Sequence, residues 1–219
     1  MTPTTASDPL VYGWWIASRA SGLVALVLVT AAVLLGLTLG GRMTRRPGMA
    51  RVVKTLHEQT ALAGLVAVAV HGLTLLGDGW LRPSLANLVA PFTLGYRPVF
   101  TGLGVIAAEL VAVLALSFYA RRRISPRRWR VAHRLTPLAY GLAVAHALGS
   151  GSDMQGWVRL ATLASVAPVG ILLLERLRAR PAARPSRPTR PLPDSNRRPL
   201  PFHGGGRSQP LGPRRAGVS

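Results

Sequence analysis

The chain has 219 residues, of which 49% are hydrophobic, and it carries a formal net charge of +20 at pH 7. These two properties conflict in a soluble protein, but they agree in a membrane protein whose charges collect in loops and tails. The chain contains no cysteine, which excludes disulfides, thiolate metal sites, cysteine-ligated iron–sulfur clusters and thiol catalysis.

Five apolar segments are long enough to cross a bilayer, for which about 20 apolar residues in a helix are needed. They run over residues 13–39, 56–76, 99–119, 131–148 and 157–174. The sequence therefore predicts an all-α integral membrane bundle of about five transmembrane helices. Its domains are a short external N-terminus (1–12), a transmembrane domain (13–176) and a tail (177–219).

Basic residues in the connections predict the orientation of these segments. Residues 42–54 and 121–130 are rich in Arg and Lys, whereas residues 1–12 and 149–156 contain neither. Residues 77–98 hold only Arg82 and Arg97. Because cytoplasmic loops carry the excess of basic residues, we expect the N-terminus outside and the C-terminus in the cytoplasm. The second and fourth segments then both begin at the cytoplasmic face and run parallel.

Four of the five histidines lie in these two parallel segments. His57 and His133 lie near the cytoplasmic ends, and His71 and His146 near the outer ends. A coordinating side chain inside a membrane is energetically costly, so its presence there indicates a specific role. Paired by depth, His57 with His133 and His71 with His146, they can supply two axial ligands to each of two haem irons. A structural role or proton transfer by the same histidines is the alternative.

Helical geometry supports this pairing in the second segment better than in the fourth. His57 and His71 are fourteen residues apart, which is about 21 Å along a helix and brings the two within roughly 40° of one face. Gly64 lies midway on that face, where a glycine lets a flat macrocycle or a neighbouring helix approach closely. In the fourth segment the spacing of thirteen leaves the histidines about 140° apart. Pro137 should distort the first turns there, and the sequence leaves open whether this corrects the phase.

The order His57, thirteen residues, His71, then His133, twelve residues, His146 resembles the ligand pattern of the ferric reductase-like transmembrane domain superfamily. That superfamily includes ferric reductases, NADPH oxidases and the haem-binding subunit of the bacterial periplasmic methionine sulfoxide reductase system. Residues 19–23 and 96–98 are also similar to small bacterial members, and the resemblance covers about residues 12–176. It implies two b-type haems with bis-histidine ligation and transmembrane electron flow in a bacterial inner membrane.

The chain departs from the larger members of that superfamily. They have six spans, and no G-x-G-x-x-G fingerprint of a flavin or nicotinamide domain follows a strand in this sequence. We therefore expect an oxidoreductase membrane subunit with no flavin or nicotinamide site of its own. Its donor would be a separate cytoplasmic flavoprotein or a quinol, and its acceptor ferric iron, oxygen or a partner protein. A haem-free transporter or assembly subunit, and a quinone-linked cytochrome that serves a partner enzyme, are the alternatives.

Two of the charged residues inside the predicted spans are candidates for a function. Arg19, near the outer end of the first segment, either pairs with a propionate of the outer haem or extends to the outer headgroups. Glu109, near the middle of the third segment, either serves a proton or quinone site or makes a structural hydrogen bond. The sequence does not decide between these alternatives.

The tail after Arg176 changes abruptly to proline, arginine and glycine. Such a segment cannot form a core, and its charge would hold it near anionic membrane lipid. No nucleic-acid partner is expected, because no interleaved aromatic residues accompany the charge. Residues 193–206 also resemble peptides that arise when a tRNA gene is translated, so an artefact of gene calling is the second interpretation. His203 lies there and is excluded as a ligand.

Overall fold

The computed structural model describes residues 9–39, 48–152 and 154–178, and these fold into helices and connecting turns, with no strand among them. The predicted all-α class is confirmed. The tail from residue 179 onward, including His203, lies outside the described residues.

Four of the predicted spans are single helices. They are α1 (Pro9–Leu39), α2 (Met49–Leu75), α4 (Pro98–Ile124) and α7 (Gly156–Arg178). Each is long and apolar enough to cross a membrane. Helix α1 begins at Pro9, within the stretch predicted as a separate N-terminus.

The fourth predicted span, residues 131–148, is not one helix. It is divided between α5 (Pro126–His133) and α6 (Thr136–Ser150), with a turn at Arg134 and Leu135. Pro137 stands in the first turn of α6, where its missing N–H costs nothing because no helical acceptor is available there. The prediction that Pro137 distorts a continuous helix is therefore wrong, because the proline lies in the first turn of a new helix. This helix, α6, is the fifth apolar helix beside α1, α2, α4 and α7.

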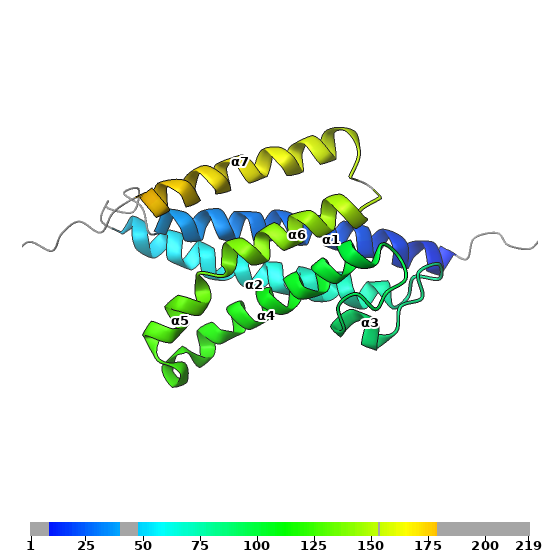
Figure 1. Cartoon of the computed structure of the whole chain (residues 1–219), viewed down its shortest axis with the longest axis horizontal. Helices are drawn as coiled ribbons and strands as arrows, with labels where there is room; N and C mark the ends of the chain where they lie inside the picture. The colour runs from blue at the N-terminus through cyan, green and yellow to red at the C-terminus, as the bar shows by residue number, and fades with distance from the viewer. Residues whose placement is uncertain (1–8, 40–47, 153, 179–219) are drawn as a thin grey trace, which may run out of the picture. The chain divides into compact units, whose positions relative to one another are not determined.

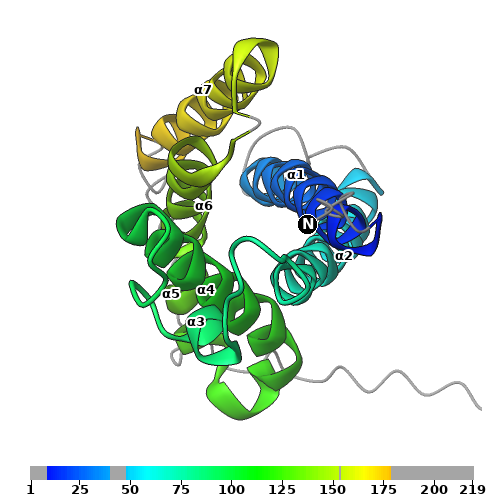
Figure 2. The ribbon, with the colours of Figure 1, turned by 90° about the vertical axis from the view of Figure 1, so that its right-hand side faces the viewer.

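The helices pack as two close pairs, and contacts made by α1 join one pair to the other. Helix α1 lies along α2, α4 lies along α6, and α1 also contacts α6 and α7 (Figures 1 and 2). The buried core joins α1, α6 and α7 and consists of Val29, Val33, Leu37, Tyr140, Val144 and Val169. The Tyr140 hydroxyl lies 3.1 Å from Ser165 Oγ and links α6 to α7. Many large apolar side chains remain exposed on the outer faces, as lipid contact requires.

The connection from α2 to α4 contains a helix that was not predicted, α3 (Leu85–Val89). Ser84 and Asn87 form a capping box at its start, which satisfies two backbone donors that the helix itself leaves open. The buried Asp78 carboxylate accepts hydrogen bonds from the backbone N–H groups of Trp80 and Leu81. This connection is therefore fixed by local polar contacts and helps to close the end of the bundle near His71.

Candidate metal and cofactor site

The structure brings the four intramembrane histidines together as two pairs. The ring centres of His57 on α2 and His133 on α5 are 6.1 Å apart, with the rings nearly perpendicular at 89°. The ring centres of His71 on α2 and His146 on α6 are 6.3 Å apart, with an angle of 67° between the rings. These are the two combinations that depth matching predicts from the sequence.

The helices that carry the histidines position them at two levels. Helix α2 is continuous from His57 to His71, so the two levels differ by about 21 Å along its axis. Helix α2 packs closely against α1 and α6 packs closely against α4, which leaves the imidazoles facing each other between the two helix pairs. The turn between α5 and α6 lets His133 and His146 face α2 despite their spacing of thirteen. This answers the phase question that the sequence left open.

The separation within each pair suits two ligands on opposite sides of one metal ion. A metal–imidazole bond is about 2 Å long and the nitrogen is about 1 Å from its own ring centre, so two opposed ligands have ring centres roughly 6 Å apart. The observed 6.1 and 6.3 Å agree with this value. Among the described residues, no three His, Cys, Asp or Glu side chains gather as a metal site. Such two-ligand sites suit an iron that brings its own equatorial ligands, as haem does.

Three of the four imidazoles are held by backbone carbonyl groups of neighbouring helices. The Nδ1–oxygen distances are 2.8 Å from His57 to Ala32, 2.7 Å from His71 to Ser18 and 2.9 Å from His146 to Phe100. A carbonyl oxygen can only accept, so each Nδ1 must carry the proton and each Nε2 keeps its lone pair for a metal. Hydrogen bonds of this kind orient a ligating imidazole and raise its basicity.

His133 is held differently. Its Nδ1 is buried and has no hydrogen-bond partner among the described residues. Its ring instead stacks on Trp129, with ring centres 5.0 Å apart and planes inclined by 23°. Arg130 and Arg134, which flank it in the sequence, are exposed. Glu58, next to His57, forms an ion pair with Lys54 at 3.6 Å.

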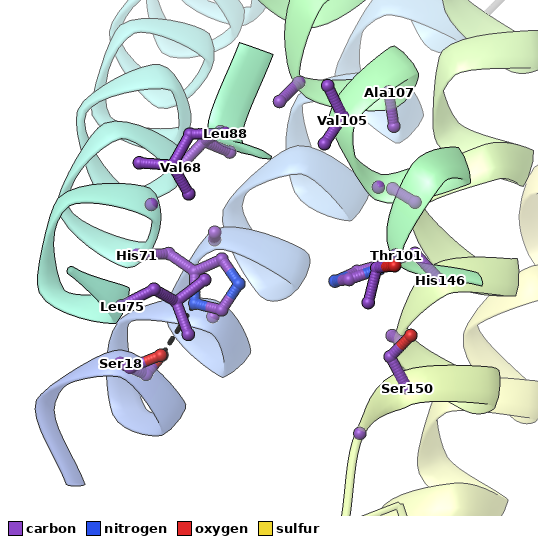
Figure 3. Close-up of a pocket in the computed structure, with 18 of the residues that line it drawn as sticks. Ser18, Val68, His71, Leu75, Leu88, Thr101, Val105, Ala107, His146 and Ser150 are labelled. Atoms are coloured by element: carbon purple, nitrogen blue, oxygen red, sulfur yellow. Dashed lines mark hydrogen bonds between the residues drawn. The ribbon is translucent and has the colours of Figure 1, made fainter. Parts of the chain in front are cut away.

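A cavity of about 270 Å³ surrounds the His71–His146 pair. Residues of α1, α2, α4, α6 and the α2–α4 connection line it, and most of its wall is apolar. Figure 3 shows the rings of His71 and His146 pointing toward each other across this space. The cavity is therefore a largely apolar space between two opposed imidazoles, of the kind that a flat hydrophobic cofactor occupies.

Two further residues singled out in the sequence lie close to these sites. Arg19 lines the cavity, donates to Ser152 Oγ and lies 4.8 Å from the centre of the Trp15 ring. Gly64 faces α1, where an added Cβ would lie 3.4 Å from Val29. The close approach that Gly64 permits is thus that of a neighbouring helix. A direct role of either residue in haem binding stays a prediction.

Sequence reasoning missed the carbonyl groups that hold the histidines. Ser18, Ala32 and Phe100 contribute only their backbone oxygens, and a backbone oxygen leaves no mark on residue identity. The one indication of these carbonyl groups in the sequence is indirect and lies in the glycines of α1 and α4.

One comparison with known proteins gives a match. The family model described as "Ferric reductase like transmembrane component" matches residues 21–144, more than half of the chain. The match includes His57, His71 and His133 and ends two residues before His146. No curated protein and no solved structure matches the chain.

Proposed function

Because the chain belongs to the ferric reductase-like transmembrane family, we propose that this multi-pass membrane protein transfers electrons across the bilayer through two b-type haems. His57 and His133 would hold one haem, and His71 and His146 the other. The observation that carries the proposal is the pair of opposed imidazole sets, with ring centres 6.1 and 6.3 Å apart, at two levels of one bundle.

Each part of the chain has a definite task in this proposal. The haems supply one-electron chemistry when bound. The carbonyl groups of Ser18, Ala32 and Phe100 keep three ligands in the tautomer that presents Nε2. The largely apolar wall around the His71–His146 pair suits the hydrophobic faces of a haem. Arg19, on the same wall, supplies a positive charge that would stabilise a haem propionate.

The proposed direction of electron flow, from the cytoplasm outward, is what the family implies, and the basic residues of the connections support the orientation of the chain. Arginines gather at the end of α4 and in α5, beside the His57–His133 pair. By the positive-inside rule this supports a cytoplasmic position for that pair, in what we propose is a bacterial inner membrane. Electrons would enter there from a separate flavoprotein, or from a quinol within the bilayer. They would leave near the His71–His146 pair to ferric iron, oxygen or a partner protein outside.

The first test is the haem content of the detergent-purified protein. A pyridine haemochrome assay and a reduced-minus-oxidised spectrum should give about two b-type haems per chain. One haem per chain would retain the redox role and remove one of the two proposed sites. No haem, after expression with an adequate haem supply, would contradict the proposal and favour the haem-free transporter or assembly subunit.

Turnover then separates a reductase from a subunit that only serves a partner enzyme. Purified protein reduced with dithionite is mixed with ferric citrate or oxygen under stopped flow, and haem reoxidation is followed in the visible spectrum. Rapid reoxidation supports direct delivery to a soluble acceptor. Haems that stay reduced with both acceptors would contradict it and assign the protein to a larger quinone-linked complex.

A further inference from the structure

Two glycines of α1 contact the two histidines of α2. A Cβ added to Gly22 would lie 2.9 Å from His71 Nδ1, and one added to Gly36 would lie 3.1 Å from His57 Cε1. Real Cβ atoms rarely tolerate such distances, so any other residue would displace the ring. Gly22 and Gly36 are fourteen residues apart, as are His57 and His71. The two antiparallel helices therefore repeat the same contact at both levels.

The same contact occurs in the other helix pair. A Cβ added to Gly104 of α4 would lie 2.6 Å from Cγ of His146 on α6. In all three cases the carbonyl that accepts from the histidine lies four residues before the glycine. The sets are Ser18 with Gly22, Ala32 with Gly36, and Phe100 with Gly104.

Helix geometry explains this interval of four residues. The carbonyl of residue i already accepts the N–H of residue i+4, and it keeps a second lone pair. Side chains lean toward the helix N-terminus, so the side chain at i+4 normally covers that carbonyl. A glycine at i+4 removes the cover and lets a donor from another helix reach the second lone pair.

We propose that Gly22, Gly36 and Gly104 are positioning residues that expose a helix carbonyl to the Nδ1–H of His71, His57 and His146, respectively. Each glycine thereby fixes the tautomer and ring orientation of a proposed haem ligand. This proposal rests on the proposed function, since the Nε2 presented in this way needs a metal to bind. His133 lacks such a contact, because its Nδ1 has no hydrogen-bond partner among the described residues.

The test replaces each of the three glycines by alanine in the full chain. Gly141→Ala on α6 is the matched control, because an added Cβ there meets nothing within 4 Å. Electron paramagnetic resonance of the ferric protein and a potentiometric titration report on each haem separately. Haem retention is measured by transfer to apomyoglobin, and size-exclusion chromatography verifies the fold.

We expect site-selective effects. Gly22→Ala and Gly104→Ala should shift the resonance and potential of the haem at His71 and His146, and lower its retention about 10- to 100-fold, as loss of an outer-shell partner does. Gly36→Ala should change only the other haem, and Gly141→Ala should change neither. If Gly104→Ala fails to fold, Gly36→Ala, with its milder 3.1 Å contact, carries the test.

Two outcomes would overturn the positioning role. In the first, all three variants keep wild-type resonances, potentials and retention. In the second, each variant weakens both haems equally, which indicates general loosening of the bundle. A wild-type protein with no haem is a different result: it removes the proposed function itself, whatever the glycine variants do.

Discussion

The two histidine pairs have nearly the same internal geometry and different surroundings. In the His71–His146 pair both Nδ1 atoms donate to helix carbonyls, and a cavity adjoins both rings. In the His57–His133 pair only His57 has such an acceptor. The Nδ1 of His133 is buried without a hydrogen-bond partner among the described residues, and Trp129 supports the ring by stacking.

This difference indicates that nearly equal ring separations do not imply equal preorganisation. The His71–His146 pair is held by backbone groups of long helices, which have little freedom to move. The His57–His133 pair depends on α5, a helix of 8 residues, and on an aromatic contact. A buried Nδ1 without a partner also loses the free energy of one hydrogen bond, about 1 kcal/mol or more. We therefore expect the haem at His71 and His146 to be bound more tightly.

The largest expected effect comes from removing one ligand of either pair. His146→Ala should remove the haem of its own pair and leave the other, so that haem content falls to about half of the wild-type value. His57→Ala should remove the haem at His57 and His133 and leave the one at His71 and His146. The two variants should therefore retain spectrally different haems. The pyridine haemochrome assay measures this, with His203→Ala as the control that keeps both. If either variant loses both haems, the sites are not independent and the comparison between them fails.

A smaller effect is expected from the stacking residue of the weaker pair. Trp129→Ala removes the ring that supports His133, and an aromatic contact contributes about 0.5–1.5 kcal/mol. The haem of that pair should be lost to apomyoglobin roughly 3- to 10-fold faster, while the other haem keeps its rate. Trp157, which is 78% exposed, provides the control Trp157→Ala. Equal loss rates for the two haems in the wild type would contradict the expected difference between the pairs.

The pairing of the histidines could be predicted because it rests on local properties. The hydropathy pattern predicted the spans, and the basic residues of the connections indicated that the two histidine-bearing segments run parallel. The sequence did not predict the division of the fourth span, because Pro137 indicated only a distortion in the first turns of one long helix. Its position one residue after Thr136 is also typical of a helix start. The residues alone did not decide between these interpretations.

The surroundings of the histidines could not be predicted for a different reason. The carbonyl groups that hold them belong to Ser18, Ala32 and Phe100, whose side chains take no part in the contact. Only the register between α1 and α2, and between α4 and α6, brings these oxygens to the rings. Register depends on packing along the whole interface, and Gly64 against Val29 is one contact that sets it.

A more modest effect concerns the charge beside the better-held pair. Arg19→Gln removes a positive charge from the cavity wall, and a charge interaction there is on the order of 1 kcal/mol. Because positive charge favours the reduced haem, the midpoint potential at His71 and His146 should fall while that of the other haem stays constant. Redox titration measures both, with Arg82→Gln as an exposed control. An unchanged potential would assign Arg19 to anchoring through Trp15 and Ser152 instead.

The smallest expected effect is on the stability of the bundle, and it should leave both histidine pairs equally unaffected. Tyr140 lies on α6 between His133 and His146 in the sequence, is 3% exposed and bonds to Ser165 of α7. Tyr140→Phe removes that bond, which inside a membrane is worth about 0.6 kcal/mol. The thermal midpoint in detergent should fall slightly, with both haem spectra unchanged, and Tyr119→Phe, at 68% exposure, should have no effect. A selective loss of one haem would mean that α6–α7 packing, and not the local carbonyl and aromatic contacts, sets the difference between the pairs.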